Sequence, residues 1–242
     1  MKKQTKIRLI FTLTVTGIWM MATTCFAHHL WVQQVEDGAY AVCRGTIGQR
    51  LDPYTPSCVT RIWAKSPDGT KISITRTNEK ERAVFTADHP PAMVSVTSEW
   101  GDRVNTTRGK KLMDKKTAQA QGFTVVSAFA STQFSKTIFA PSRINTQALG
   151  LRFELLPLTD PATLAPGTPV SVKLLFDGQP LAGMSVLTNM DQESRTDENG
   201  VTQIIFEKTG IHLLYATHQI PATKDSGLDF LKFMTFLTFE VK

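Results

Sequence analysis

Short runs in which apolar and polar residues alternate dominate the chain between residues 40 and 98. Alternation with a period of two is typical of strands that bury one face of a sheet. Turn-forming segments separate the runs, such as SPDGT at 66–70 and HPP at 89–91. The predicted strands are Tyr40 to Cys43, Val59 to Ala64, Lys71 to Thr75, Ala83 to Thr86 and Met93 to Ser98. Short strands at this spacing predict an antiparallel sandwich.

The strand pattern returns after Gly150 and is clearer there. Alternating runs begin at Leu151 and Pro169, and the dipeptide Asp177-Gly178 predicts a tight turn. Three further runs at 184–190, 201–210 and 211–218 are separated by turn residues, including RTDENG at 195–200. The last run, 232–242, has a period-two alternation and ends in charged residues, which argues against a membrane helix.

The middle of the chain, residues 101–149, is polar and basic at first and then fits neither the helical nor the strand period cleanly. Asp114 to Gln121 favours a short helix with Asp114 as its cap. We therefore expect an all-β protein with two immunoglobulin-like antiparallel β-sandwich domains, at 28–100 and 150–242. We expect an irregular connector at 101–149 that packs against one or both of them.

The first 27 residues have the three parts of an export signal. A largely apolar run at 9–22 precedes Cys25 and Ala27, which are small residues at the −3 and −1 positions of a cleavage site. The run is shorter than the roughly 20 residues of a spanning helix. We expect cleavage after Ala27 and a periplasmic protein, with lipid attachment at Cys25 as the alternative. The basic start consists of Lys2, Lys3, Lys6 and Arg8.

The net charge of +6 is mostly a property of this leader, which holds four of the 27 basic residues and none of the 21 acidic ones. The remaining chain has no stripe of basic residues with interleaved aromatic residues, so we expect no nucleic-acid partner. The basic cluster from Arg108 to Lys116 is interpreted as a solvated loop or short helix.

Two cysteines, Cys43 and Cys58, remain after cleavage, and an even count in an oxidising compartment predicts a disulfide. The bridge would close a loop of roughly 15 residues, worth about 3 kcal/mol in the loop-entropy account. A thiolate metal site is the rival interpretation, but the chain has no CxxC pair.

Histidines supply the candidate metal ligands. With cleavage after Ala27, the α-amine of His28, its imidazole and the side chain of His29 lie within a few ångströms, which suits Ni²⁺, Co²⁺, Cu²⁺ or Zn²⁺. His218 ends a predicted strand beside polar residues and is a candidate rim ligand. His212 stands six residues earlier, roughly 20 Å away at about 3.3 Å per residue, so the two cannot share one ion. For each of these side chains a purely structural role is the alternative.

Two other features are interpreted without a ligand. His89, inside DHPP, reads as a turn residue. The TDENG segment lacks the ligand spacing of a calcium loop, and Asn199-Gly200 would supply positive φ values in a hairpin turn.

The mature start HHLWV, the segment VTSEWGDRVNTTRGKK and the run from PGTPVSVKLLF to IHLLYATH resemble the NikM-type family of periplasmic proteins associated with nickel and cobalt uptake. The resemblance covers nearly the whole mature chain. It implies a β-sandwich protein, not an enzyme, that binds or delivers a divalent metal. It also implies an inner-membrane metal transporter component as the partner. His28 or His29 and His218 match family histidines, whereas Gly45-Thr46 stands where many members have Gly-His.

Three functional hypotheses follow. The first is a periplasmic accessory protein that binds nickel or cobalt through His28, His29 and His218 for an uptake system. The second is a copper protein, either a chaperone or an oxidase, built on the terminal histidine. The third is a structural sandwich protein without a metal. No nucleophile triad, paired-carboxylate signature or phosphate loop stands out in the sequence, so we expect no enzyme.

Overall fold

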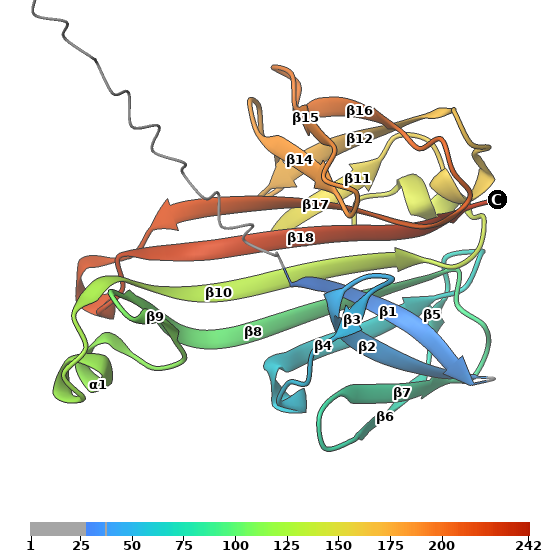
Figure 1. The fold of residues 1–242 in the computed structure, drawn as a ribbon. Helices are drawn as coiled ribbons and strands as arrows, with labels where there is room; N and C mark the ends of the chain where they lie inside the picture. The colour runs from blue at the N-terminus through green and yellow to red at the C-terminus, as the bar shows by residue number, and fades with distance from the viewer. Residues whose placement is uncertain (1–27, 37) are drawn as a thin grey trace, which may run out of the picture.

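The computed structural model describes residues 28–36 and 38–242, so the predicted leader at 1–27 lies outside the described residues. The described chain is nearly all β, which confirms the predicted all-β class of packed, mainly antiparallel sheets (Figure 1). No helix among these residues is long and apolar enough to cross a membrane.

A large central sheet organises the fold. Its strand order is β15-β14-β17-β18-β10-β8-β4-β5, with β9 paired to β8. The four longest strands, β8, β10, β18 and β17, run side by side through the middle of the molecule (Figure 1). The strands are β4 (Val59–Lys65), β5 (Lys71–Ile72), β8 (Met93–Thr106), β9 (Gly109–Lys111), β10 (Val125–Ile138), β14 (Ser185–Thr188), β15 (Glu193–Arg195), β17 (Gly210–Pro221) and β18 (Phe230–Val241).

Two small sheets complete the fold. The first small sheet has the order β1-β2-β7-β6, with β3 paired to β2, and the second has the order β11-β12-β13, with β16 paired to β12. The strands of the first are β1 (His29–Glu36), β2 (Ala39–Thr46), β3 (Arg50–Leu51), β6 (Ile74–Asn78) and β7 (Ala83–Ala87). Those of the second are β11 (Phe153–Pro157), β12 (Pro169–Phe176), β13 (Gln179–Pro180) and β16 (Val201–Ile205).

The small sheets cover opposite faces of the central sheet. Because successive side chains of a strand point to opposite faces, neighbours on β18 enter different cores. Phe236 packs with Leu30 and Phe85 under the first small sheet, whereas Leu237 packs with Phe153 and Leu174 under the second. The result is a three-layer arrangement in which both cores share one sheet.

The segment 101–149 is more regular than its sequence predicted. It contains β10, which pairs antiparallel with β8 and parallel with β18, so strands from both ends of the sequence join one sheet. The short helix is confirmed as α1 (Lys115–Ala120), where the Asp114 carboxylate accepts a hydrogen bond from the amide of Thr117. Single-turn 3-10 helices lie at Pro56–Cys58, Arg143–Thr146, Pro161–Thr163 and Lys224–Ser226.

A buried ion pair joins the second small sheet to the central sheet. Lys136 Nζ on β10 donates to Glu154 Oε1 on β11 at 2.7 Å, and both side chains are 2% exposed. Glu154 also accepts from the amides of Leu149 and Leu151, so its carboxylate is well satisfied. Burial lowers the pKa of Lys136, and the charge of Glu154 opposes that effect.

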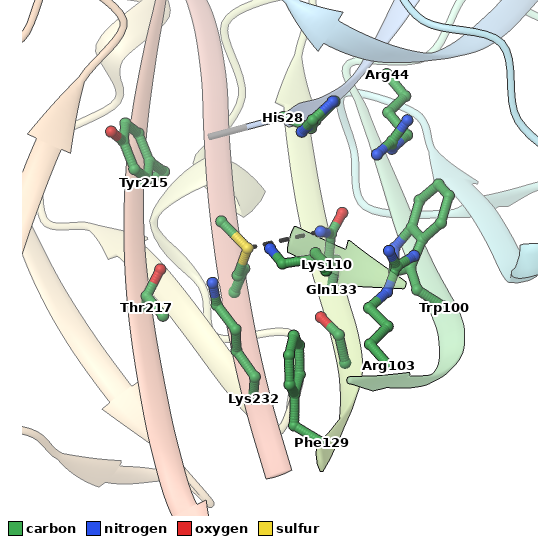
Figure 2. Close-up of a pocket in the computed structure, with 12 residues that line it drawn as sticks. His28, Arg44, Trp100, Arg103, Lys110, Phe129, Gln133, Tyr215, Thr217 and Lys232 are labelled. Carbon is green, nitrogen blue, oxygen red and sulfur yellow. Dashed lines mark hydrogen bonds between the residues drawn. The ribbon is translucent and has the colours of Figure 1, made fainter. Parts of the chain in front are cut away.

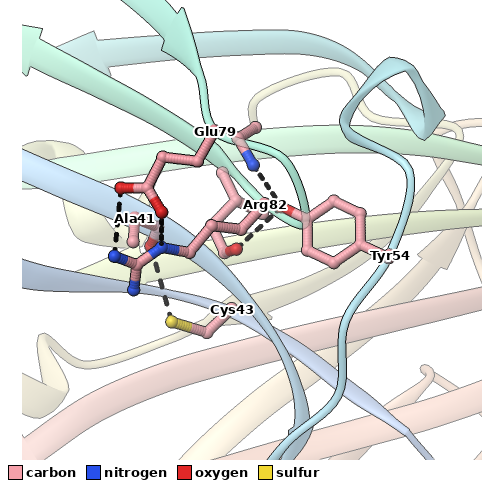
Figure 3. A network of polar contacts seen from close by, with 7 residues as sticks. Ala41, Cys43, Tyr54, Glu79 and Arg82 are labelled. Atoms are coloured by element: carbon pink, nitrogen blue, oxygen red, sulfur yellow. Dashed lines mark hydrogen bonds and ion pairs between the residues drawn. The ribbon is translucent and has the colours of Figure 1, made fainter.

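The predicted disulfide between Cys43 and Cys58 is not formed in the structure, where both are free thiols. Cys43 lies in the first core, and its thiol donates to the carbonyl of Ala41, 3.7 Å away (Figure 3). Burial raises the pKa of Cys43 to about 11. A buried and protonated thiol is a weak nucleophile, so it acts here as a small core residue.

The loop between the cysteines is held by Tyr54 instead of by a covalent bond. Its hydroxyl donates to the carbonyl of Val42 at 2.7 Å and accepts from the amide of Ala83 at 3.0 Å (Figure 3). These two bonds tie the loop that the predicted disulfide would have closed to β2 and β7.

One of the two predicted tight turns has the backbone conformation that the sequence predicted, and the other does not. Asp177 and Gly178 both have positive φ, as the predicted hairpin turn requires. In TDENG only Gly200 has positive φ, while Asp197 Oδ1 accepts from the amides of Asn199 and Val201. The turn is therefore stabilised by an aspartate side chain rather than by an Asn-Gly pair.

Candidate functional site

A pocket of about 260 Å³ opens on the central-sheet face that carries the first small sheet. Side chains from β2, β8, β9, β10, β17 and β18 line it, together with His28 just before β1 (Figure 2). It lies toward one end of the long strands, where residues of β10 such as Phe129 and Ser131 form its floor. We call it the cationic pocket because Arg44, Arg103, Lys110 and Lys232 line it without any carboxylate among its described lining residues.

Trp100 organises the two arginines of the cationic pocket. The guanidinium carbon of Arg44 lies 4.8 Å from the ring centroid of Trp100, and that of Arg103 lies 6.0 Å away. Trp100 is 6% exposed, and its Nε1 donates to Ser98 Oγ at 2.9 Å, which fixes the ring. Both guanidinium groups thus lie near the fixed indole ring, which Arg44 and Arg103 approach from different strands (Figure 2).

Two of the positive charges in the pocket, on Arg44 and Arg103, are partly buried, and Arg44 repels Arg103. Burial lowers the pKa of Arg103, and the charge of Arg44 lowers it further. Burial also lowers the pKa of Arg44, an effect that the carboxylate of Asp52 opposes. Arginine stays protonated in proteins, so the lowered pKa values reflect mainly the cost of burying the two charges and, at Arg103, the repulsion from Arg44. A bound anion would relieve this repulsion.

His28 is the predicted metal ligand that reaches this pocket. Its side chain is 41% exposed, and its Nε2 lies 3.2 Å from Asp52 Oδ2. Burial is the main reason that the pKa of His28 is lowered, and the charge of Arg44 lowers it further. The carboxylate of Asp52 opposes both effects.

His29 is held apart from His28, because adjacent strand residues face opposite ways. It is 5% exposed, its ring centroid lies 5.3 Å from that of Tyr215, and its Nδ1 accepts from the amide of Ile47 at 3.5 Å. Burial lowers the pKa of His29 to about 4, with a further contribution from the charge of His28. The structure therefore gives His29 a packing role.

His218 lies on the opposite face of the central sheet, so it cannot share an ion with His28. Its ring packs on Phe176 and Phe153, with centroids 4.7 Å and 6.0 Å away, and burial lowers its pKa. His212 packs on Phe206, as expected for a strand residue, and His89 lies exposed in a bend. Within residues 28–36 and 38–242, no three histidine, cysteine or acidic side chains are gathered to hold a metal ion.

Sequence reasoning missed the arginines of the pocket. Arg44, Trp100 and Arg103 belong to different strands and form no local motif. Lys110 lies in the basic cluster that was interpreted as a solvated segment, and β9 carries it to the pocket rim. The only local signal was Arg103, three residues after Trp100 on a strand that otherwise alternates.

Comparison with known proteins gives little functional information. A search of curated proteins found no match. Among solved structures, the D0-D1 domain of Intimin aligns with 14% identity and a TM-score of 0.22, over 87% of this chain and 97% of that one. Residues 25–220 match the sequence profile described as "Domain of unknown function (DUF4198)". The match spans well over half of the chain, and the protein therefore belongs to the DUF4198 family.

Proposed function

We propose that the protein is an exported, non-catalytic binding protein that holds a small multivalent anion in the cationic pocket. The observation that carries the proposal is the convergence of Arg44, Arg103, Lys110 and Lys232 on one cavity that no described carboxylate lines. Charge-assisted hydrogen bonds from such groups contribute roughly 1.5–3 kcal/mol each. The cavity volume lies just below the range of about 300–1,000 Å³ that is typical of drug-sized ligands, which suits a smaller one.

The test is calorimetric titration of the chain that begins at His28 with sulfate, phosphate, oxalate and citrate at low ionic strength. Anions of charge two or more should bind to the wild-type protein, and Arg103→Gln should weaken that binding by roughly 10- to 100-fold. Arg61→Gln is the matched control, because Arg61 is exposed and outside the pocket. Equal affinity in the Arg103→Gln and Arg61→Gln variants, or no binding of any anion, would refute the proposal.

A metal-binding accessory role in nickel or cobalt uptake, beside an inner-membrane transporter, is the second candidate. One observation favours it: His28 Nε2 lies close to Asp52, so cleavage after Ala27 would add an α-amine to an imidazole and a carboxylate. This donor set suits divalent transition metals, including copper. The charges of Arg44, Arg50 and Lys110, which lower the pKa of His28, equally oppose a bare cation, so we rank this role second.

The metal proposal is tested by titrating Ni²⁺, Co²⁺, Cu²⁺ and Zn²⁺ into three proteins. These are the chain beginning at His28, its His28→Ala variant, and a chain that retains Ala27 and so moves the α-amine by one residue. Tight binding only in the first protein supports the amine-based site. Equal affinity in all three argues against it.

A further inference from the structure

Within the part of the chain that the structure describes, two buried polar atoms of pocket-lining residues find no hydrogen-bond partner. They are Nε of Arg44, a donor, and Oε1 of Gln133, an acceptor. A buried polar group without a partner costs stability, so such atoms at a cavity indicate where a ligand completes the bonding. A ligand that satisfies both atoms must accept one hydrogen bond and donate another.

Gln133 lines the pocket, and a neighbouring methionine orients its side-chain amide. The residue is 7% exposed, and its Nε2 donates to Met234 Sδ at 3.6 Å (Figure 2). Its Oε1 accepts no hydrogen bond from the described residues, so a ligand that donates a hydrogen bond could satisfy it. Ionised carboxylates and sulfate only accept hydrogen bonds, so an anion without a hydroxyl or amine group would leave Gln133 unsatisfied.

The spacing of the cations favours a ligand with more than one anionic group. Arg103 on β8 and Lys232 on β18 are separated by β10, which places their strands roughly 10 Å apart at about 4.8 Å per step. A ligand that carries several anionic groups can contact cations from both strands at once. The apolar surfaces of Trp100, Phe129 and Met234 between the cations suit a short carbon skeleton.

From this arrangement we infer that the ligand of the cationic pocket is a hydroxylated polycarboxylate, whose carboxylates contact Arg44 and Arg103 and whose hydroxyl donates to Gln133 Oε1. The inference rests on the proposed anion-binding function and names the ligand class for that site. It assigns Gln133 the role of distinguishing hydroxylated acids from plain ones.

Citrate and tricarballylate make a matched pair of probes, because they differ by one hydroxyl group. In metal-free buffer, wild-type protein should bind citrate about tenfold or more tightly than tricarballylate, since a site with a buried hydrogen-bonding group discriminates against a ligand that cannot pair with it. Malate should likewise bind to the wild-type protein more tightly than succinate. Gln133→Leu should reduce the citrate preference to below about threefold while tricarballylate affinity stays the same.

Gln203→Leu, an exposed position on β16 outside the pocket, is the control and should keep the wild-type preference. Equal affinities within both pairs for the wild-type protein would overturn the inference while leaving the anion-binding proposal intact. Failure of every anion to bind would overturn both. If Gln133→Leu does not fold, the two wild-type pairs decide the question alone.

Discussion

The two faces of the strand pair β17 and β18 are built for different tasks. On the face with the first small sheet, Tyr215, Thr217, Lys232 and Met234 reach the cationic pocket. On the other face, Leu214, Ala216, Phe233 and Leu237 belong to the second core. The first face is thus polar and open only around the pocket, since Phe236 on that face is covered by the first small sheet, whereas the other face is largely apolar and covered.

The two faces differ in how their charged side chains are compensated. Lys136, on the covered face, is matched by Glu154, whereas the cations of the pocket face converge without a lining carboxylate among the described residues. The buried charge of Lys136 is compensated by its hydrogen-bonded partner, whereas the repulsion between Arg44 and Arg103 is a cost that a bound anion would reduce.

The largest effect is expected on the covered face. Lys136→Met should lower the free energy of unfolding by roughly 3–5 kcal/mol, because it leaves the carboxylate of Glu154 buried without its cation. Urea unfolding at neutral pH measures the change. Adding Glu154→Leu to this variant should recover much of the loss, and a single variant as stable as wild type would contradict the matched-charge account.

His29 should give the pocket-side core a pH dependence. Its pKa falls from 6.5 to about 4 on folding, so the fold favours the neutral ring. The stability that the neutral ring of His29 contributes is fully present above pH 6.5 and is lost as the pH falls through about 4. Between these values wild-type protein should lose roughly 3 kcal/mol more stability than His29→Gln.

Chemical denaturation at a series of pH values, in metal-free buffer, measures that difference. His89→Gln is the control, because His89 is exposed, and it should follow the wild-type curve. Parallel curves for wild type and His29→Gln would show that the ring is not held neutral by the core.

His218 should behave as a packing residue of the covered face. Its ring lies between Phe153 and Phe176, so His218→Phe should change the free energy of unfolding by less than about 1.5 kcal/mol. Anion and metal affinity should be unchanged in the same variant. If His218→Phe lost metal binding, His218 would have to be a metal ligand and not only a packing residue.

The smallest stability effect is expected for Arg103→Gln. Removing one of two mutually repelling guanidinium groups should offset the lost contact with Trp100 and leave the free energy of unfolding within about 1 kcal/mol of wild type. Thermal or urea unfolding without ligand gives the comparison. A loss as large as that of Lys136→Met would mean that Arg103 serves the fold rather than a ligand.

The strands were predictable because alternation is a local property of the sequence. The runs near 169–176 and 232–241, the Asp177-Gly178 turn and the cap at Asp114 all have local signals, and the structure confirms them. Strand pairing is not local: β10 and β18 lie about a hundred residues apart and pair in parallel. No repeat or spacing in the sequence encodes that partner.

The candidate site was harder to predict for the same reason. The sequence drew attention to adjacent histidines, yet alternation along the strand separates His28 from His29, and the central sheet separates both from His218. Arg44, Arg103 and Gln133 meet only because β2, β8 and β10 approach one another in the fold. Their roles follow from tertiary contact, which a single sequence does not display.

The most direct test of the anion-binding account is a crystal structure of the chain beginning at His28, grown with citrate. The account predicts citrate in the cationic pocket, with carboxylate oxygens on Arg44 and Arg103 and the hydroxyl on Gln133 Oε1. Citrate bound elsewhere, or a water-filled pocket at a citrate concentration that saturates binding in solution, would contradict it.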